Sequence, residues 1–186
     1  KPLKFYFRQK TKRKAQTLLF KNVSQNLREG NLMALDAKQE DLIVGIVGAG
    51  AMGRGIAQVA AGGGCLVKLY DAKEGEAAEA QAFVRKMFDR NVEKRRMAQE
   101  DAEDAAARIE VINSMSGFAG SQCIIEAVVE NLDVKHVVFK ELESIVADNC
   151  VIATNTSSLS VSAIASACEK PERVAGLHFF NPVPLM

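Results

Sequence analysis

Three glycines within six residues are placed where they would let a backbone wrap around a phosphate group. An apolar run ends at Val47, and Gly48, Gly50 and Gly53 follow it before a helical pattern begins. The first permits a tight turn, the second lets the backbone approach a pyrophosphate, and the third lets the helix pack close to the strand. The helix N-terminus attracts phosphate through its free N–H groups and its dipole. The predicted dinucleotide-binding loop comprises Gly48, Ala49, Gly50, Ala51, Met52 and Gly53.

An acidic residue follows the next apolar run at the spacing that this kind of loop requires. Asp71 ends the run 66–70 and lies 18 residues after Gly53, where its carboxylate can accept both hydroxyls of an adenosine ribose. A 2′-phosphate would be repelled by that charge, so NAD is predicted rather than NADP, although Lys73 leaves NADP open. A glycine turn in another α/β domain, with Asp71 as a helix cap, would not explain why these features fall in register.

A second group of polar residues offers a base and hydroxyl groups. Residues 154–159 read Thr-Asn-Thr-Ser-Ser-Leu, and His178 and Asn181 follow after another apolar run. Both segments lie at the carboxyl ends of expected parallel strands, where ligands bind. Hydride transfer needs a base with a pKa near 7 and a hydroxyl to orient the reacting oxygen. The alternatives are a serine N-cap for the helix near 160 and a histidine that ends a buried strand.

Short apolar runs alternate with longer helical patterns from Leu42 onward, which is typical of βα units. The sequence therefore predicts an α/β fold, a doubly wound parallel Rossmann sheet of six or more strands flanked by helices. We expect strands near 42–47, 65–70, 108–112, 122–128, 150–154 and 173–178, and helices near 51–62, 74–99, 134–148 and 160–168. Residues 93–107, rich in charge and alanine, are expected to form a solvated helix. His136, in a charged helical stretch, is given no role.

Composition limits the class of protein. The chain has 186 residues, of which 48% are hydrophobic, enough for one domain and a short appendage. It contains no apolar run of about 18 residues, so no membrane span is expected. Its four cysteines are widely spaced, which favours reduced, buried thiols over disulfides or a metal site.

Residues 1–32 carry nine Lys or Arg and one acid. This basic extension could be a transit peptide, the end of a preceding domain, a nucleic-acid arm or sequence of non-native origin. We expect an upstream or non-native extension before a domain spanning 33–186, and a cytoplasmic protein, or a mitochondrial-matrix one if the extension is a targeting sequence. Nucleic-acid binding is not expected, because the basic residues are not accompanied by an aromatic stacking pattern or by a nucleic-acid-binding module.

Four separated segments, in one order, resemble the 3-hydroxyacyl-CoA dehydrogenases, and the resemblance covers about residues 42–186. They are Gly48-Ala49-Gly50-Ala51-Met52-Gly53, Glu126-Ala127-Val128-Val129-Glu130-Asn131, Asn155-Thr156-Ser157-Ser158 and His178-Phe179-Phe180-Asn181-Pro182-Val183-Pro184. The order and spacing of four motifs are far more specific than the glycine loop alone.

The resemblance implies roles for residues in each segment. His178 is the catalytic base, and Ser157 contacts the 3-oxygen of the substrate or the nicotinamide ribose. Asn181 holds the nicotinamide end of the cofactor. The remaining implied contacts are Glu130, Lys135 and Asn155 with NAD, and Lys94 with the phosphates of coenzyme A.

The implied reaction is the NAD-dependent, reversible oxidation of a 3-hydroxyacyl-CoA in fatty-acid or aromatic-acid catabolism. In the family a glutamate that pairs with the histidine, and a helical domain with the acyl pocket and homodimer interface, follow the segment that ends here at Met186. We therefore expect NAD binding without full activity. The alternatives are a small hydroxy-acid dehydrogenase, part of a multifunctional β-oxidation protein, or a non-catalytic NAD-binding protein related to lens crystallins.

Overall fold

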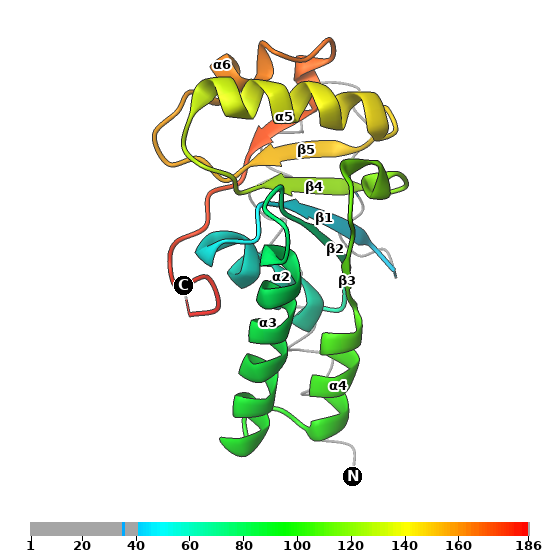
Figure 1. Ribbon diagram of the computed structural model, residues 1–186, viewed down its shortest axis with the longest axis vertical. Coiled ribbons are helices and arrows are strands. Elements are labelled where there is room, and N and C mark those ends of the chain that lie inside the picture. Colours follow the sequence, from blue (N-terminus) through cyan, green and yellow to red (C-terminus); the bar gives the residue numbers. More distant parts are fainter. Residues whose placement is uncertain (1–34, 36–40, 186) are drawn as a thin grey trace.

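The computed structural model describes residue 35 and residues 41–185, and its centre is one parallel sheet (Figure 1). The strand order is β3-β2-β1-β4-β5-β6, so the chain starts in the middle and reverses direction across the sheet between β1 and β4. This is the predicted doubly wound arrangement, and that prediction is confirmed. The strands are β1 (Ile43–Val47), β2 (Leu66–Tyr70), β3 (Ile109–Val111), β4 (Cys123–Glu126), β5 (Val151–Thr154) and β6 (Val174–Gly176).

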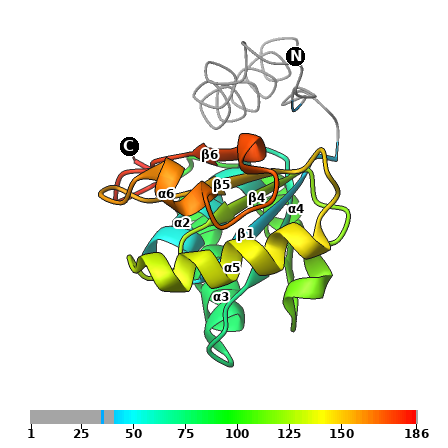
Figure 2. The same cartoon turned by 90° about the horizontal axis from the view of Figure 1, so that it is seen from above.

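Helices cover both faces of the sheet, because its strands are apolar on both sides. Ile125 and Ala153 belong to one core cluster with α2 (Ala51–Gly62), α3 (Glu76–Glu93) and α4 (Gln99–Ala107). Their neighbours Ile124 and Ile152 point the other way, into a cluster with the 3-10 helix η1 (Met115–Phe118), α5 (Leu132–Ile145) and α6 (Val161–Ala165). Figure 2 shows α5 running along its face of the sheet. A second 3-10 helix, η2 (Pro171–Arg173), leads into β6.

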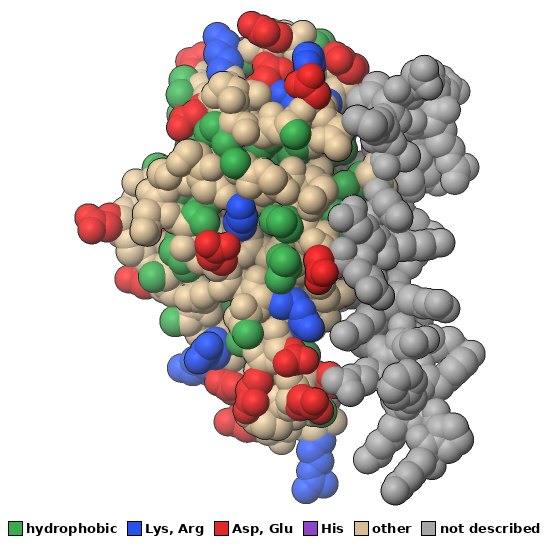
Figure 3. All heavy atoms as spheres, turned by 90° about the vertical axis from the view of Figure 1, so that its right-hand side faces the viewer, with side chains coloured by type: hydrophobic (Ala, Val, Ile, Leu, Met, Phe, Trp, Pro, Cys, Tyr) green, Lys and Arg blue, Asp and Glu red, His purple; other side chains and the backbone are tan. Residues whose placement is uncertain are grey.

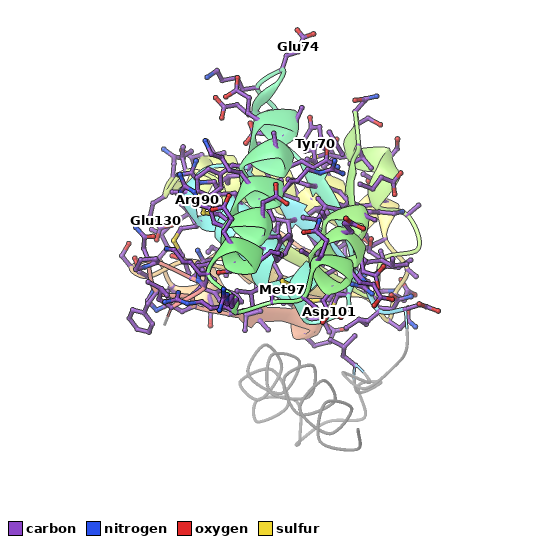
Figure 4. The ribbon with its side chains drawn as sticks, turned by 90° about the horizontal axis from the view of Figure 1, so that it is seen from below. Tyr70, Glu74, Arg90, Met97, Asp101 and Glu130 are labelled. Carbon is purple, nitrogen blue, oxygen red and sulfur yellow. The ribbon has the colours of Figure 1, made fainter. Side chains whose placement is uncertain are left out.

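The predicted helix 74–99 is wrong at its end, because α3 stops at Glu93 and the chain turns before α4. Arg95 has a left-handed backbone, with φ 55°, in a stretch without glycine, so the sequence gives little warning of the turn. Figure 4 marks this hairpin by Arg90 on α3, Met97 in the turn and Asp101 on α4.

Residues 93–107 also do not form the wholly solvated helix that was expected. Ala102 and Ala105 of α4 are each only 1% exposed, because their short side chains let this helix pack closely into the core. The opposite side of α4 carries the acids of its sequence Gln-Glu-Asp-Ala-Glu-Asp, and acidic side chains gather at the lower end of the face in Figure 3. The two helices therefore form a packed arm beneath the sheet.

Several strands are shorter than predicted, and the residues left over at their carboxyl ends form loops at that edge of the sheet. β4 ends at Glu126 instead of 128, where the Glu126 carboxylate accepts the Val128 N–H at 2.8 Å and turns the backbone. β6 ends at Gly176, so His178 lies beyond the strand. α5 begins earlier than predicted because the Asn131 side chain caps it, accepting the Val134 N–H at 3.1 Å.

The four cysteines are free thiols, as predicted. Cys65, Cys123 and Cys150 are buried, and Cys168 is half-buried. Burial raises the pKa of Cys65 to about 11 and that of Cys150 to about 12, so both stay protonated at neutral pH.

The predictions for residues 1–32 lie outside the described residues. Within the part of the chain that the structure describes, none of the helices is long and apolar enough to cross a membrane.

Candidate functional site

The turn between β1 and α2 has the geometry that the glycine spacing predicts. Gly48 has φ 97°, and a Cβ there would lie 2.6 Å from the Ala127 carbonyl oxygen. A Cβ on Gly53 would overlap the Gly48 carbonyl group, so the helix could not approach the strand. Gly50 is different, because its missing Cβ would meet nothing within 4 Å. The first and third glycines are thus required by the fold, whereas the second borders open space.

The start of α2 fits a phosphate. No side chain caps the helix and its first turn holds no acid. Its first internal hydrogen bond runs from the Arg54 N–H to the Gly50 carbonyl at 3.0 Å, so the preceding N–H groups have no acceptor within the helix. Free N–H groups and the positive end of the helix dipole attract an anion here.

Asp71 joins the loop after β2 to the glycine loop. One carboxylate oxygen accepts the Ala49 N–H at 2.7 Å, and the other accepts the Lys73 N–H at 2.9 Å. A carboxylate can accept about four hydrogen bonds, which leaves capacity for two ribose hydroxyls. The Lys73 ammonium, which left NADP open, is paired with Glu76. The residues present therefore fit the adenosine half of NAD.

A buried ion pair lies under the loops after β4 and β5. Glu126 is fully buried and accepts three hydrogen bonds, from the Val128 N–H at 2.8 Å, the Thr154 hydroxyl at 2.7 Å and the Lys135 ammonium at 2.6 Å. Lys135 is also fully buried, and its Nζ lies 3.3 Å from Glu130. The sequence analysis placed Glu126 in one of the four family segments but assigned it no role, although a glutamate at the end of the apolar run 123–126 was a usable signal.

Glu130 organises the polar turn at 156–158. Its carboxylate accepts from the Thr156 hydroxyl, from the Ser158 hydroxyl at 3.0 Å, and from the Ser157 and Ser158 N–H groups at 3.3 Å. Burial alone would raise the pKa of Glu130, but the hydrogen bonds from Thr156 and Ser158 and the charge of Lys135 outweigh it and lower this pKa to about 2. The N-cap of α6 is Ser160, so neither Ser157 nor Ser158 caps that helix.

The loop after β6 is tied to the loop after β5. The Leu177 N–H donates to the Thr154 carbonyl at 2.9 Å, and the Phe179 N–H donates to the Asn155 side-chain oxygen at 2.8 Å. His178 lies between these contacts and is exposed, with its ring 4.7 Å from that of Phe180. The alternative of a histidine buried at a strand end is therefore wrong.

The segment after His178 returns to α2 (Figure 1). Asn181 is exposed, whereas Val183 is buried in the core cluster of α2. A Cβ on Gly55 would lie 2.9 Å from the Val183 Cβ, so this contact requires glycine. The structure thereby brings the histidine loop, the serine turn and the glycine loop to one edge of the sheet.

Lys94 is not brought to that edge. It is the exposed C-cap of α3, whose first turn follows the Asp71 loop, and 18 helical residues span about 27 Å. The His136 Nε2 lies 2.8 Å from the Ala163 carbonyl oxygen, between α5 and α6. This contact joins the two helices.

Known proteins are similar to this chain in both sequence and fold. A family described as 3-hydroxyacyl-CoA dehydrogenase, NAD binding domain, matches residues 43–186. The chain is 38% identical over 144 residues to 3-hydroxybutyryl-CoA dehydrogenase of Mycobacterium tuberculosis, an alignment covering 77% of this chain and 50% of that protein. It is also 38% identical over 141 residues to a fatty acid oxidation complex subunit alpha of Psychrobacter, covering 76% and 20% respectively.

A solved structure has the same fold as this chain. The structure of 3-hydroxybutyryl-CoA dehydrogenase from Escherichia coli K12 superposes with a TM-score of 0.77 at 36% identity, covering 80% of this chain and 31% of that one. The chain thus spans half or less of the length of these relatives. The predicted family and the predicted NAD cofactor are confirmed by the family match. The chain belongs to the family of NAD-binding domains of the 3-hydroxyacyl-CoA dehydrogenases.

Proposed function

We propose that the protein containing this domain oxidises a 3-hydroxyacyl-CoA to the 3-ketoacyl-CoA, reversibly. The observation that carries the proposal is the arrangement of the glycine loop, the serine turn and the exposed His178 at one sheet edge, with the latter two joined by the hydrogen bond from Phe179 to Asn155. Bound NAD supplies the hydride acceptor. The domain supplies placement, a base and oriented donors.

Each half of the cofactor has its own set of residues in this proposal. Asp71 and the glycine loop hold the adenosine and pyrophosphate on the β1 and β2 side of the edge. The nicotinamide half then lies across the switch between β1 and β4, where dinucleotides cross such sheets. The residues assigned to it are Glu130, Lys135, Asn155, Ser157 and Asn181. Lys135 acts on this half through Glu130, because its fully buried ammonium is enclosed by Glu126 and Glu130.

His178 acts as the base and takes the proton from the substrate 3-hydroxyl. Its exposure gives substrate access to the imidazole, and the flanking backbone contacts of Leu177 and Phe179 fix the loop that carries it. The Ser157 hydroxyl donates to the substrate 3-oxygen or to the nicotinamide ribose, while Glu130 holds its backbone N–H.

The remaining assignments describe the complete protein. The names of the relatives support an acyl-CoA substrate and a place in fatty-acid oxidation, and their bacterial origin supports a cytoplasmic location. Lys94 is assigned to the phosphates of coenzyme A, on the far end of α3. We assign residues 33–186 to the NAD-binding domain, and homodimer formation to the helical domain of the family.

Two measurements test the proposal. Fluorescence titration of this domain should show binding of NADH and much weaker binding of NADPH, and equal affinities would contradict the role of Asp71. The complete protein should oxidise NADH when acetoacetyl-CoA is added. Turnover with small hydroxy acids but not with acyl-CoA would indicate a small hydroxy-acid dehydrogenase. NADH binding without any turnover would indicate a non-catalytic NAD-binding protein.

A further inference from the structure

Two carboxylates share one ammonium group at the carboxyl edge of the sheet. Lys135 lies between Glu126 at 2.6 Å and Glu130 at 3.3 Å, and the side chains of Glu126 and Lys135 are completely buried. The three residues come from the end of β4, the loop after it and the first turns of α5. We call them the β4 charge cluster.

Both carboxylates are surrounded by hydrogen-bond donors. Glu126 accepts hydrogen bonds from the Val128 N–H, the Thr154 hydroxyl and the Lys135 ammonium. Donors favour the charged form of a carboxylate. The pKa of Glu130 is lowered to about 2, because its hydrogen bonds and Lys135 outweigh the effect of burial. Lys135 neutralises one of the two charges, so the cluster keeps one surplus negative charge.

The position of the cluster gives that charge a target, and this step rests on the proposed function. Glu130 binds the N–H groups of Ser157 and Ser158, which border the proposed nicotinamide half of the site. Asp71 contacts the glycine loop instead, on the adenosine half. The nicotinamide ring is positively charged in NAD⁺ and neutral in NADH, whereas the adenosine half is the same in both.

We propose that the β4 charge cluster makes the site prefer the oxidised cofactor, and that buried Glu126 determines this preference. Its negative charge cancels Lys135, so that the charge of Glu130 is left to act on the ring. Without Glu126, the remaining ammonium and carboxylate would cancel each other and the electrostatic preference would be lost. This role differs from holding the cofactor, because it changes the ratio of the affinities for NAD⁺ and NADH. A residue that only holds the cofactor would change both affinities by the same factor.

The test is the ratio of the dissociation constants of NAD⁺ and NADH, measured by calorimetry on the domain and on its Glu126→Gln variant. Glutamine has the same shape, and the Thr154 hydroxyl can rotate to accept from its amide. Loss of one charge in a partly solvated site should raise the ratio about fivefold. A merely structural role would weaken both affinities alike and leave the ratio unchanged.

Two control variants separate charge from general damage. Asp71→Asn should weaken NAD⁺ and NADH binding by the same factor, because its partner is the adenosine half. Glu143→Gln removes a carboxylate from the other end of α5 and should leave the ratio unchanged. If Glu126→Gln does not fold, as judged by circular dichroism, Glu130→Gln takes its place, and it should raise the ratio in the same direction.

The outcomes are distinct. A wild-type domain that binds neither cofactor refutes the proposed function. Normal binding by the wild type, with a ratio that changes in neither Glu126→Gln nor Glu130→Gln, overturns the present inference alone. An equal rise of the ratio in Glu143→Gln would also overturn it, because the effect would then come from the overall charge of the domain.

Discussion

Helix α5 has a buried cation near each end, and the two surroundings differ in charge. Near its start Lys135 lies between Glu126 and Glu130, which gives two carboxylates to one cation. Near its end Arg173, 3% exposed, pairs with Glu143 at 3.3 Å, which gives one carboxylate to one cation. The first cluster is at the carboxyl edge of the sheet and the second is at the amino edge, just before β6.

From this difference we infer that burial serves stability at the amino edge and ligand binding at the carboxyl edge. Arg173 also donates to the carbonyls of Ala147 and Glu143, and the Glu143 carboxylate accepts the N–H groups of Glu169 and Lys170. That cluster is neutral and closes the chain on itself. In the β4 charge cluster, by contrast, the Glu130 side chain is 37% exposed, and two carboxylates face one ammonium group. We expect mutations at the carboxyl edge to change ligand binding and catalysis, and mutations at the amino edge to change stability.

The largest effect should come from His178→Gln in the complete protein. Removal of a general base lowers kcat by about 10² to 10⁴-fold, while NADH affinity and the melting temperature should change little. Steady-state kinetics with acetoacetyl-CoA measure kcat, and fluorescence titration measures the NADH affinity. A near-normal kcat would show that His178 is not the base, and it would contradict the assignment of catalysis to the carboxyl edge.

Arg173→Met should break the amino-edge cluster and lower the free energy of unfolding by about 3 kcal/mol, because Glu143 loses its charged partner. NADH affinity of the folded variant should match that of the wild type. Lys170→Met is the matched control, since Lys170 pairs with Asp148 at the surface and should cost less than about 1 kcal/mol. Urea denaturation of both variants gives the values, and reduced NADH affinity in Arg173→Met would contradict the division between the edges.

Asp71→Ala should weaken NADH binding by about 1 to 3 kcal/mol, the range for losing a charged hydrogen-bond acceptor. The Ala49 N–H also loses its acceptor, so a small loss of stability accompanies the weaker binding. Calorimetric titration measures the affinity. An unchanged dissociation constant would show that the ribose is bound elsewhere.

The smallest effect concerns acid stability. The pKa of Glu130 in the folded protein is about 2, below its ordinary value of 4.5, so its charge stabilises the fold above about pH 4.5. That contribution is lost as the pH falls from about 4.5 to about 2. Since the side chain is partly exposed, the change should stay below about 1 kcal/mol. The difference in unfolding free energy between wild type and Glu130→Gln should shrink across this window, and a constant difference would refute the assignment.

Local sterics explain why much of the fold and the glycine loop could be predicted. Gly48 and Gly53 are needed because a Cβ would collide with backbone only a few residues away or in the adjacent loop, and this requirement is visible in the spacing. Asp71 comes directly after β2, whose register with β1 places it beside the glycine loop. The parallel order of the strands follows from the alternation of apolar runs with helices.

Contacts between distant segments explain what could not be predicted. The role of Glu126 depends on Thr154, 28 residues away, and no local pattern reports that contact. The burial of Lys135 depends on the same carboxylate. The turn after α3 depends on how α4 packs, since its sequence continues a helical pattern through Arg95.

The contact between Gly55 and Val183 links the phosphate-binding helix to the segment that carries His178. We expect two sites joined in this way to share a coupling free energy, which thermodynamic linkage would make reciprocal. Any factor by which a displaced Val183 weakens cofactor binding must equal the factor by which bound cofactor favours the docked segment. Because the missing side chain of Gly55 permits this contact, we expect the order of the segment that carries His178 to rise with cofactor concentration.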